Sequence, residues 1–280
     1  MPELAAIRYG AMDVVGQFEV EQEQLREGDQ VIIRTDRGVE WGEVVRPRVD
    51  PAETVIGEPA GNILRKASEQ DLVKQREIRE VRERDEHKFC QELITKYALP
   101  MKLVRAEHLF GGNKLIFFFL ADGRVDFRQL VKDLAKQYRT RIEMRQIGVR
   151  DEARLLGEFG ACGRELCCRT FLKSLKPIPM KIAKSQKSTL DPAKISGRCG
   201  RLKCCLNFED GLYAELKRSL PRRGSKVKTA IGEGLVVGYD IMAQTVEVRF
   251  TDDTEQTLPV TEVEVLGGRE EREEEEKADQ

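Results

Sequence analysis

The sequence predicts an α+β protein built from several small domains, and three observations lead to this prediction. Short segments rich in β-branched residues, separated by turn residues, occupy both ends of the chain. The middle alternates helical and strand patterns, and a segment rich in cysteine, glycine and basic residues follows it. A chain of 280 residues is long enough for two or three domains. The expected parts are a strand-rich N-terminal part (1–60), an α+β domain (61–154), a cysteine-rich segment (155–215), an SH3-like β domain (221–266) and a disordered acidic tail (267–280).

Four short strands are expected in the N-terminal part. Each is rich in β-branched or alternating apolar residues, and the turn at Asp36–Gly38 joins the last two. Strand–turn–strand units of this size predict a small half-barrel or sheet. The expected strands cover residues 5–9, 14–20, 29–35 and 39–45.

The middle domain is expected to place helices over one face of a mainly antiparallel sheet. A long helix begins after Ser68, which fits a capping box with Asp71, and it ends before Pro100. The segment Gly111–Asn113 separates two strand-like runs and predicts a hairpin. The order helix–strand–strand–helix–strand favours an α+β sandwich. The expected elements are a helix over 69–97, strands over 102–110 and 114–121, a helix over 127–139 and a strand over 141–147.

The C-terminal domain again has a strand pattern interrupted by turns such as Asp252-Asp253. This pattern resembles a small SH3-like barrel, a shape that by itself carries little information about function. The expected strands cover residues 225–229, 234–239, 244–250 and 255–259.

The net charge of −1 hides an uneven distribution of charged residues. Residues 162–228 carry 17 Lys or Arg against 5 Asp or Glu, whereas residues 269–280 carry 3 against 7. A basic segment attracts phosphates, an acidic partner or the negative charge of a metal–thiolate cluster. The acidic end is interpreted as a solvated tail.

Several classes of protein are excluded by the sequence. The longest apolar stretch, Leu115–Ala121, is too short to span a bilayer, and the N-terminus lacks the pattern of a secretory signal. We therefore expect a cytoplasmic protein, in which clustered cysteines bind metal or act in redox chemistry. The chain has no P-loop, dinucleotide-binding glycine motif or nucleophile elbow, so it is not expected to be an enzyme.

A cysteine motif occurs twice in the basic segment. The blocks Cys162–Cys168 and Cys199–Cys205 share the spacing C-x4-C-C and a Gly-Arg pair, with an offset of 37 residues. Thiolates are soft ligands, so the doubled motif predicts an iron–sulfur or other metal site, with zinc or a thiol–disulfide switch as alternatives. The candidate ligands are Cys162, Cys167, Cys168, Cys199, Cys204 and Cys205.

Residues beside the cysteines are expected to support this site. Gly163 and Gly200 allow the backbone to fold closely round a ligand. The seventh cysteine, Cys90, lies in the expected long helix and is interpreted as a buried apolar residue. Basic side chains are expected to offset the negative charge of a thiolate-ligated cluster or to contact partners. These candidates are Arg164, Arg201, Lys184 and Lys194.

The residues around both blocks closely resemble the bacterial YaaT (RicT) family, which carries the PSP C-terminal conserved region. Gly160–Leu172, Lys181–Gln186 and Leu190–Glu209 carry the resemblance, which extends over most of the chain. The departures from the family pattern are Ile182, Asp191 and Phe208. None of them removes a cysteine.

The resemblance implies a non-enzymatic cytoplasmic regulator whose ternary complex with partner proteins carries two [4Fe–4S] clusters. It implies partners as well, namely small helical YlbF-like and YmcA-like proteins and the endoribonuclease RNase Y. Through them the protein is expected to act in mRNA processing and in the control of sporulation, biofilm formation and competence. RNA is expected to be contacted directly or through a partner. A zinc-stabilised RNA- or DNA-binding protein and a thiol redox switch are the alternatives.

Overall fold

The computed structural model describes residues 3–20, 24–49, 59–172 and 175–266, so the predicted acidic tail lies outside the described residues. The chain divides into two compact units. The first comprises Met1–Leu175 together with Gly197–Arg201, and the second comprises Lys176–Ser196 and Leu202–Gln280. The second cysteine block is therefore shared between the units, with Cys199 in the first unit.

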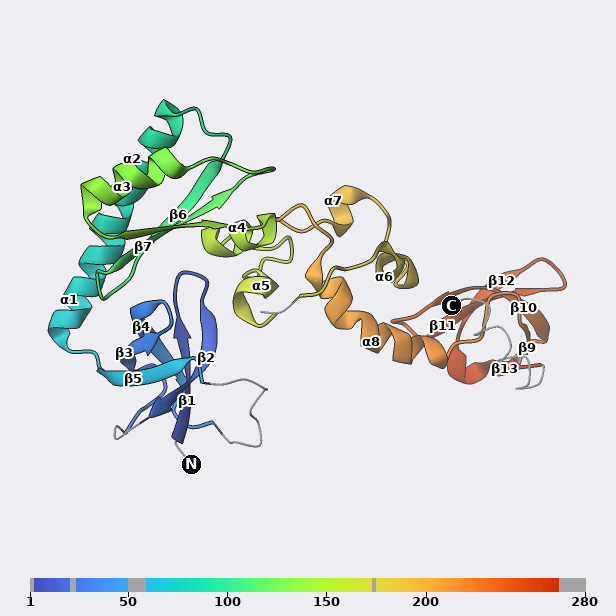
Figure 1. Ribbon diagram of the computed structural model, residues 1–280. Coiled ribbons are helices and arrows are strands. Elements are labelled where there is room, and N and C mark those ends of the chain that lie inside the picture. Colours follow the sequence, from blue (N-terminus) through green and yellow to red (C-terminus); the bar gives the residue numbers. More distant parts are fainter. Residues whose placement is uncertain (1–2, 21–23, 50–58, 173–174, 267–280) are drawn as a thin grey trace. The chain divides into compact units, whose positions relative to one another are not determined.

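The first unit begins with a closed five-stranded barrel, where the sequence predicted a half-barrel or sheet (Figure 1). The strand order is β1-β2-β5-β3-β4, and β4 pairs with β1 to close the barrel. Closure depends on β5, which starts after residue 60, where the predicted strand-rich part ends. This strand runs parallel to β2 and antiparallel to β3. The strands are β1 (Glu3–Tyr9), β2 (Val14–Val20), β3 (Gln30–Thr35), β4 (Gly38–Arg46) and β5 (Gly61–Lys66).

Alternation of side chains along the strands produces the barrel core. Ile7, Phe18 and Ile33 point inward and are completely buried. Tyr9 packs edge-on against Phe18, with ring centroids 5.3 Å apart. The period-two apolar pattern therefore predicted the strands correctly, although it could not show that they close.

A three-stranded sheet with the order β6-β7-β8 follows the barrel. The strands β6 (Lys102–His108) and β7 (Lys114–Leu120) form the predicted antiparallel hairpin. The strand β8 (Arg141–Gln146) lies parallel to β7, so the sheet is mixed rather than mainly antiparallel. Parallel neighbours need a crossover connection, and the helix α3 (Arg128–Tyr138) provides it by leading from the end of β7 back to the start of β8.

The predicted long helix is a continuous helical run of three segments. It begins at the predicted capping box, in which the Ser68 hydroxyl accepts a hydrogen bond from the Asp71 amide and the Asp71 carboxylate accepts one from the Ser68 amide. Its segments are α1 (Glu69–Glu77), a π-helical turn (Ile78–Arg82) and α2 (Glu83–Lys96).

Both faces of the sheet are covered. Helices α2 and α3 pack on one face around Phe117 and Leu134. On the other face, Ile116 and Phe118 pack in a cluster that includes Met12 of the barrel (Figure 1). The two predicted helices thus share one face as expected, and the opposite face is covered by the barrel together with Leu155, which lies in the next helix along the chain.

The cysteine-rich segment is more helical than its weak periodicity indicated. Helix α4 (Val149–Leu156) leads into it, and in the first unit the segment contains α5 (Cys167–Thr170). In the second unit it contains α6 (Met180–Ser185), α7 (Pro192–Ile195) and the 15-residue α8 (Cys204–Arg218). No helix in the described part of the chain is long and apolar enough to cross a membrane.

The second unit ends in an antiparallel sheet with the order β12-β11-β10-β9-β13. The sheet is open, so the predicted SH3-like barrel is wrong in this respect. Its two edge strands, β12 and β13, pair with β11 and β9 and not with each other in the described structure. The strands are β9 (Lys226–Lys228), β10 (Glu233–Asp240), β11 (Thr245–Phe250), β12 (Glu255–Pro259) and β13 (Glu264–Val265), with a 3-10 turn at Val260–Glu262.

Candidate functional site

The first cysteine block forms a tight turn followed by a helix. A bridge between Phe159 and Glu165 closes the turn, and the Gly160 amide donates to the Arg164 carbonyl at 2.8 Å. The Gly163 amide donates to the Gly160 carbonyl at 3.0 Å, and Gly163 has a φ of +77°. This positive φ explains the glycine, because other residues pay strain in the left-handed region. Helix α5 then begins at Cys167.

The second block repeats this geometry 37 residues later. A bridge joins Ser196 to Leu202, and the Gly197 amide donates to the Arg201 carbonyl at 2.8 Å. The Gly200 amide donates to the Gly197 carbonyl at 3.0 Å, with a φ of +73° at Gly200. Helix α8 then begins at Cys204. The sequence repeat is therefore a repeat of backbone conformation.

In each turn the sulfur of the first cysteine lies close to a glycine, Gly160 in the first turn and Gly197 in the second. A Cβ atom on Gly160 would lie 3.3 Å from the Cys162 sulfur, and one on Gly197 would lie 3.8 Å from the Cys199 sulfur. The first distance is shorter than an ordinary van der Waals contact. The absence of a side chain at Gly160 therefore leaves room for the Cys162 sulfur.

The tip of the second turn and the first block belong to the same unit, and side chains connect them. The guanidinium of Arg198 pairs with Glu158, with Nε 2.9 Å from Oε2. The guanidinium of Arg201 lies beside Gly148, the residue that precedes α4. The sequence did not predict the ion pair between Arg198 and Glu158, because the two residues are 40 positions apart and no local pattern links them.

Cys168 and Cys199, one from each block, are close enough to interact electrostatically. Burial raises the pKa of the Cys168 thiol, and the nearby Cys199 raises this pKa further, while Arg154 and Arg150 lower it. The raised pKa of Cys168 favours its neutral thiol, and added positive charge would oppose this effect. One thiol from each block thus influences the other, while a shared cluster site stays a prediction.

The other predicted ligands are placed differently. Cys162 is exposed and Cys167 is half-buried, both in the first unit. Cys204 and Cys205 are half-buried in the first turn of α8, in the second unit. Within the described ranges, no three His, Cys, Asp or Glu side chains are grouped so that they could hold a metal ion.

The seventh cysteine behaves as the sequence predicted. Cys90 is completely buried on α2, in the cluster with Leu93 and Phe117. Burial raises the pKa of its thiol to about 12, so this thiol is inert at neutral pH.

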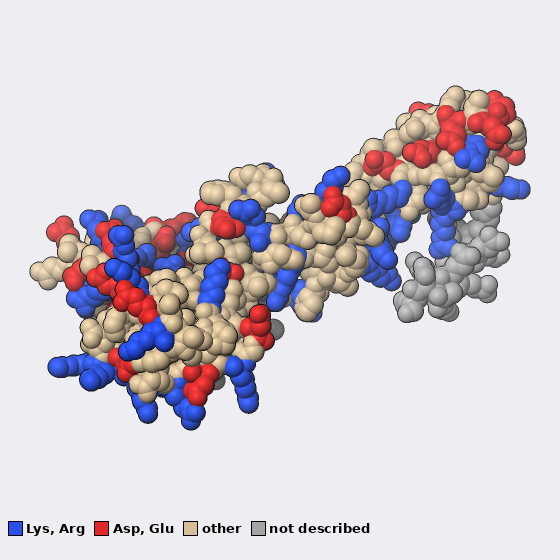
Figure 2. Space-filling model, turned by 90° about the horizontal axis from the view of Figure 1, so that it is seen from above, with Lys and Arg blue, Asp and Glu red and all other residues tan. Residues whose placement is uncertain are grey.

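The basic candidates lie on the surface of the cysteine-rich segment. Arg164, Lys184 and Lys194 are exposed, and the Lys203 ammonium donates to the Lys194 carbonyl. In Figure 2, Lys and Arg side chains gather over the cysteine-rich segment, whereas Asp and Glu gather over the C-terminal sheet. Large apolar side chains are also exposed in this segment, among them Leu156, Phe159, Met180, Leu190 and Leu212.

Comparison with known proteins gives two family matches. Residues 61–147 match the PSP1 C-terminal conserved region, and residues 177–220 match the third domain of PSP1-like proteins. The first match covers β5 to β8 with their helices, and the second covers α6 to α8 with the second cysteine block. No solved structure matches the chain.

Three curated proteins are similar in sequence. The stage 0 sporulation protein YaaT of Bacillus subtilis is 44% identical over 222 residues, which cover 79% of this chain and 80% of that protein. An uncharacterized protein of Schizosaccharomyces pombe is 27% identical over 41% of this chain and 19% of its own length. The protein PSP1 of Saccharomyces cerevisiae is 44% identical over 48 residues, which cover 17% of this chain and 6% of PSP1.

Proposed function

The chain belongs to the family of the stage 0 sporulation protein YaaT and the PSP1 C-terminal conserved region, and from this premise we propose that it is a non-enzymatic regulatory adaptor carrying an iron–sulfur cluster. The cluster would be of the [4Fe–4S] type. The protein would act in sporulation control and mRNA processing through small helical YlbF-like and YmcA-like partners and RNase Y.

The observation that carries the proposal is the repeated turn. Two turns of equal geometry each present a leading thiol above a glycine, and a thiol pair follows at the start of the next helix. The thiols that would hold iron are Cys162, Cys167, Cys168 and Cys199 in the first unit, with Cys204 and Cys205 in the second. Thiolates and amide N–H groups around sulfur are the usual surroundings of iron–sulfur clusters.

The electrostatics of the site support the same proposal. A cluster held by four thiolates is negatively charged, and the segment around it has a large excess of Lys and Arg. The pKa of Cys168 is raised by burial and by Cys199, and bound iron would supply the positive charge that favours the Cys168 thiolate. When bound, the cluster would supply one-electron redox chemistry or a structural link between the turns.

Anaerobic purification tests the proposal. The protein, produced with its helical partners, is expected to be brown and to contain iron and sulfide. Cys162→Ser and Cys199→Ser should each remove most of the visible absorption and iron. Cys90→Ala is the matched control, because Cys90 is buried away from the turns, and it should retain both. Iron-free protein from these preparations would contradict the proposal.

A second function, a zinc-stabilised RNA- or DNA-binding protein, is favoured by the basic cysteine-rich segment. Zinc prefers four thiolate or imidazole ligands, and phosphate neutralisation by Lys and Arg makes nucleic-acid binding depend on salt. Metal analysis separates zinc from iron. Binding of the purified protein to single-stranded RNA that weakens steeply between low and moderate salt would support this second function. Absence of binding at low salt would remove it.

A further inference from the structure

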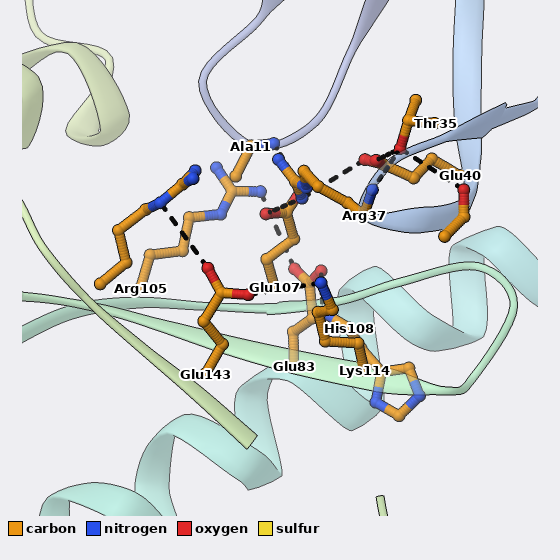
Figure 3. Close-up of polar contacts among 12 residues, drawn as sticks. Ala11, Thr35, Arg37, Glu40, Glu83, Arg105, Glu107, His108, Lys114 and Glu143 are labelled. Atoms are coloured by element: carbon orange, nitrogen blue, oxygen red, sulfur yellow. Dashed lines mark hydrogen bonds and ion pairs between the residues drawn. The ribbon is translucent and has the colours of Figure 1, made fainter. Parts of the chain in front are cut away.

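A cluster of buried charged side chains joins the barrel to the sheet, and the proposed cysteine chemistry does not use it (Figure 3). Arg37, in the turn between β3 and β4, places Nη2 2.6 Å from Oε2 of Glu107 on β6. The same nitrogen lies 3.3 Å from Oε2 of Glu40. The other oxygen of Glu107 accepts a hydrogen bond from the Ala11 amide of the barrel at 2.7 Å. One guanidinium is therefore shared between two carboxylates that are almost completely buried.

The second half of the cluster lies where β6 meets the long helical run. The His108 ring nitrogen Nδ1 is 2.6 Å from Oε1 of Glu86, and both side chains are buried. Glu83 accepts a hydrogen bond from the His108 amide at 3.2 Å, and its other oxygen is 3.8 Å from the Arg105 guanidinium. Glu83 follows directly after the π-helical turn, a local irregularity that often marks functional positions.

The fixed charges of this cluster do not balance. Four carboxylates, those of Glu40, Glu83, Glu86 and Glu107, face two guanidinium groups, those of Arg37 and Arg105. The surplus of two negative charges is buried, and burying uncompensated charge is costly. Protons on the carboxyls whose pKa burial raises, Glu40 and Glu83, can remove the surplus. The oxygens Oε2 of Glu40 and Oε2 of Glu86 make no hydrogen bond within the described part of the chain, although the former lies 3.3 Å from Arg37 Nη2.

Charged groups from the neighbouring elements surround the cluster and offset its surplus only in part. Lys114 of β7 pairs with Glu143 of β8 at 3.4 Å, which leaves that pair neutral. Glu143 also lies 3.9 Å from Arg145, whose side chain is partly exposed. Other titratable groups that influence the cluster are Tyr9, Asp36, Arg79 and Tyr138.

The protonation equilibria agree with this count of charges. Burial raises the pKa of Glu83 to about 7, and Arg105 only partly opposes this effect. Burial likewise raises the pKa of Glu40, although Thr35 donates a hydrogen bond to this carboxylate and Arg37 lies beside it.

We propose that this cluster makes the junction between the barrel and the sheet a proton-sensitive joint, which is closed while the carboxylates hold protons and loosens as they lose them. Loss of a proton leaves unpaired negative charges on β4, β6 and α2, and these repel each other across the junction. Opening admits water and relieves the repulsion.

The sign of the pH dependence follows from linkage. A carboxyl with a raised pKa in the closed state contributes stability below its ordinary pKa of about 4.5 and loses it as the pH rises through the closed-state value. For Glu83 that window lies between about 4.5 and about 7. Within it, release of one proton on opening increases the opening constant by about tenfold per pH unit. Above it, the contribution of Glu83 levels off.

The full chain contains two probes of this joint. The Gly111 amide donates to the Val39 carbonyl of the barrel at 3.0 Å, so its hydrogen exchange reports opening of the junction. The single tryptophan, Trp41, packs against Phe110 with ring centroids 5.7 Å apart, so quenching of its fluorescence by acrylamide provides a second readout.

Hydrogen exchange at Gly111, corrected for the intrinsic pH dependence of amide exchange, should give an opening constant that rises about tenfold per unit between pH 5.5 and 6.5 and flattens above pH 7.5. Glu83→Gln and Glu40→Gln should each reduce this slope, because an amide stays neutral. Glu43→Gln, on the same strand as Glu40 but partly exposed and paired with Arg8, should leave it unchanged. An opening constant that is independent of pH in the unmodified chain would overturn the proposal. An unchanged slope in folded Glu83→Gln and Glu40→Gln would overturn it too.

Discussion

Strand β7 and helix α8 show two different ways in which this chain is ordered. Five successive residues of β7, Leu115–Phe119, are buried, because α2 and α3 cover one face of the sheet and the barrel covers the other. Helix α8 has 15 residues and none of them is buried. The first region is stabilised by apolar burial, and the second is ordered by local turns and by the contacts of a few half-buried side chains.

The difference in burial indicates which region is stable by packing alone and which region would gain stability from a ligand. Buried apolar surface contributes about 25 cal/mol per Å² to folding, so a strand buried on both faces needs no further ligand. A helix that begins with two cysteines and exposes Leu212 gains little from burial. The cysteine-rich segment is therefore the region whose stability should respond most to a bound metal or partner.

The largest expected effect comes from truncating the core of the first region. Phe117→Ala should lower the free energy of unfolding by about 3–5 kcal/mol, because the completely buried ring leaves a cavity among its neighbours. Leu212→Ala, on the exposed part of α8, should change it by less than about 0.5 kcal/mol. Guanidinium denaturation measures both values. Equal losses for the two variants would remove the distinction between the regions.

The next effect concerns the buried charges of the first region. Arg37→Met should cost about 3 kcal/mol at neutral pH, because it leaves Glu40 and Glu107 buried without their shared cation. The loss should shrink at acidic pH, where the carboxylates are protonated. Arg34→Met, at an exposed position on β3, is the matched control and should have little effect. A cost that stays constant with pH would contradict the assigned role of the cation.

A smaller effect is expected in the cysteine turns. Gly163→Ala and Gly200→Ala should each cost about 1–2 kcal/mol of local stability, because both glycines have a positive φ. A Cβ would meet no neighbouring atom at either position, so the cost comes from backbone strain. Limited proteolysis within residues 159–203 measures this loss as cleavage that is about 5–30 times faster. Gly123→Ala, which has open space and no positive φ, should leave the rate unchanged. Unaltered cleavage in both turn variants would show that backbone strain does not determine these turns.

The smallest effect tests how weakly tertiary contacts constrain α8. Gly211 lies inside this exposed helix with nothing close to the position of a Cβ, so Gly211→Ala should stabilise the helix by about 0.5–1 kcal/mol. Ala214→Gly, at another exposed position of α8, should have the opposite sign. Thermal unfolding followed by circular dichroism measures the pair. A destabilising Gly211→Ala would place another part of the protein against this face.

Much of the local structure could be predicted from the sequence. The strand over 14–20 has its predicted bounds, and the capping box at Ser68 and the hairpin between β6 and β7 are confirmed. The repeated cysteine block was visible in the sequence, and the structure gives both copies the same turn at Gly163 and Gly200. These features depend on residues that are neighbours along the chain, so periodicity, turn residues and spacing contain the information.

Tertiary structure alone decided the features that join distant segments. Insertion of β5 between β2 and β3 closes the barrel, the C-terminal sheet stays open, and Arg37 meets Glu107 across 70 positions of sequence. The contact that pairs Arg198 with Glu158 is likewise invisible in the spacing of the cysteines. The sequence by itself determined the local elements and the doubled set of thiols, because both follow from short-range residue patterns. Which elements pair, and which charges are buried together, depends on packing between residues far apart in the chain, and no local pattern records it.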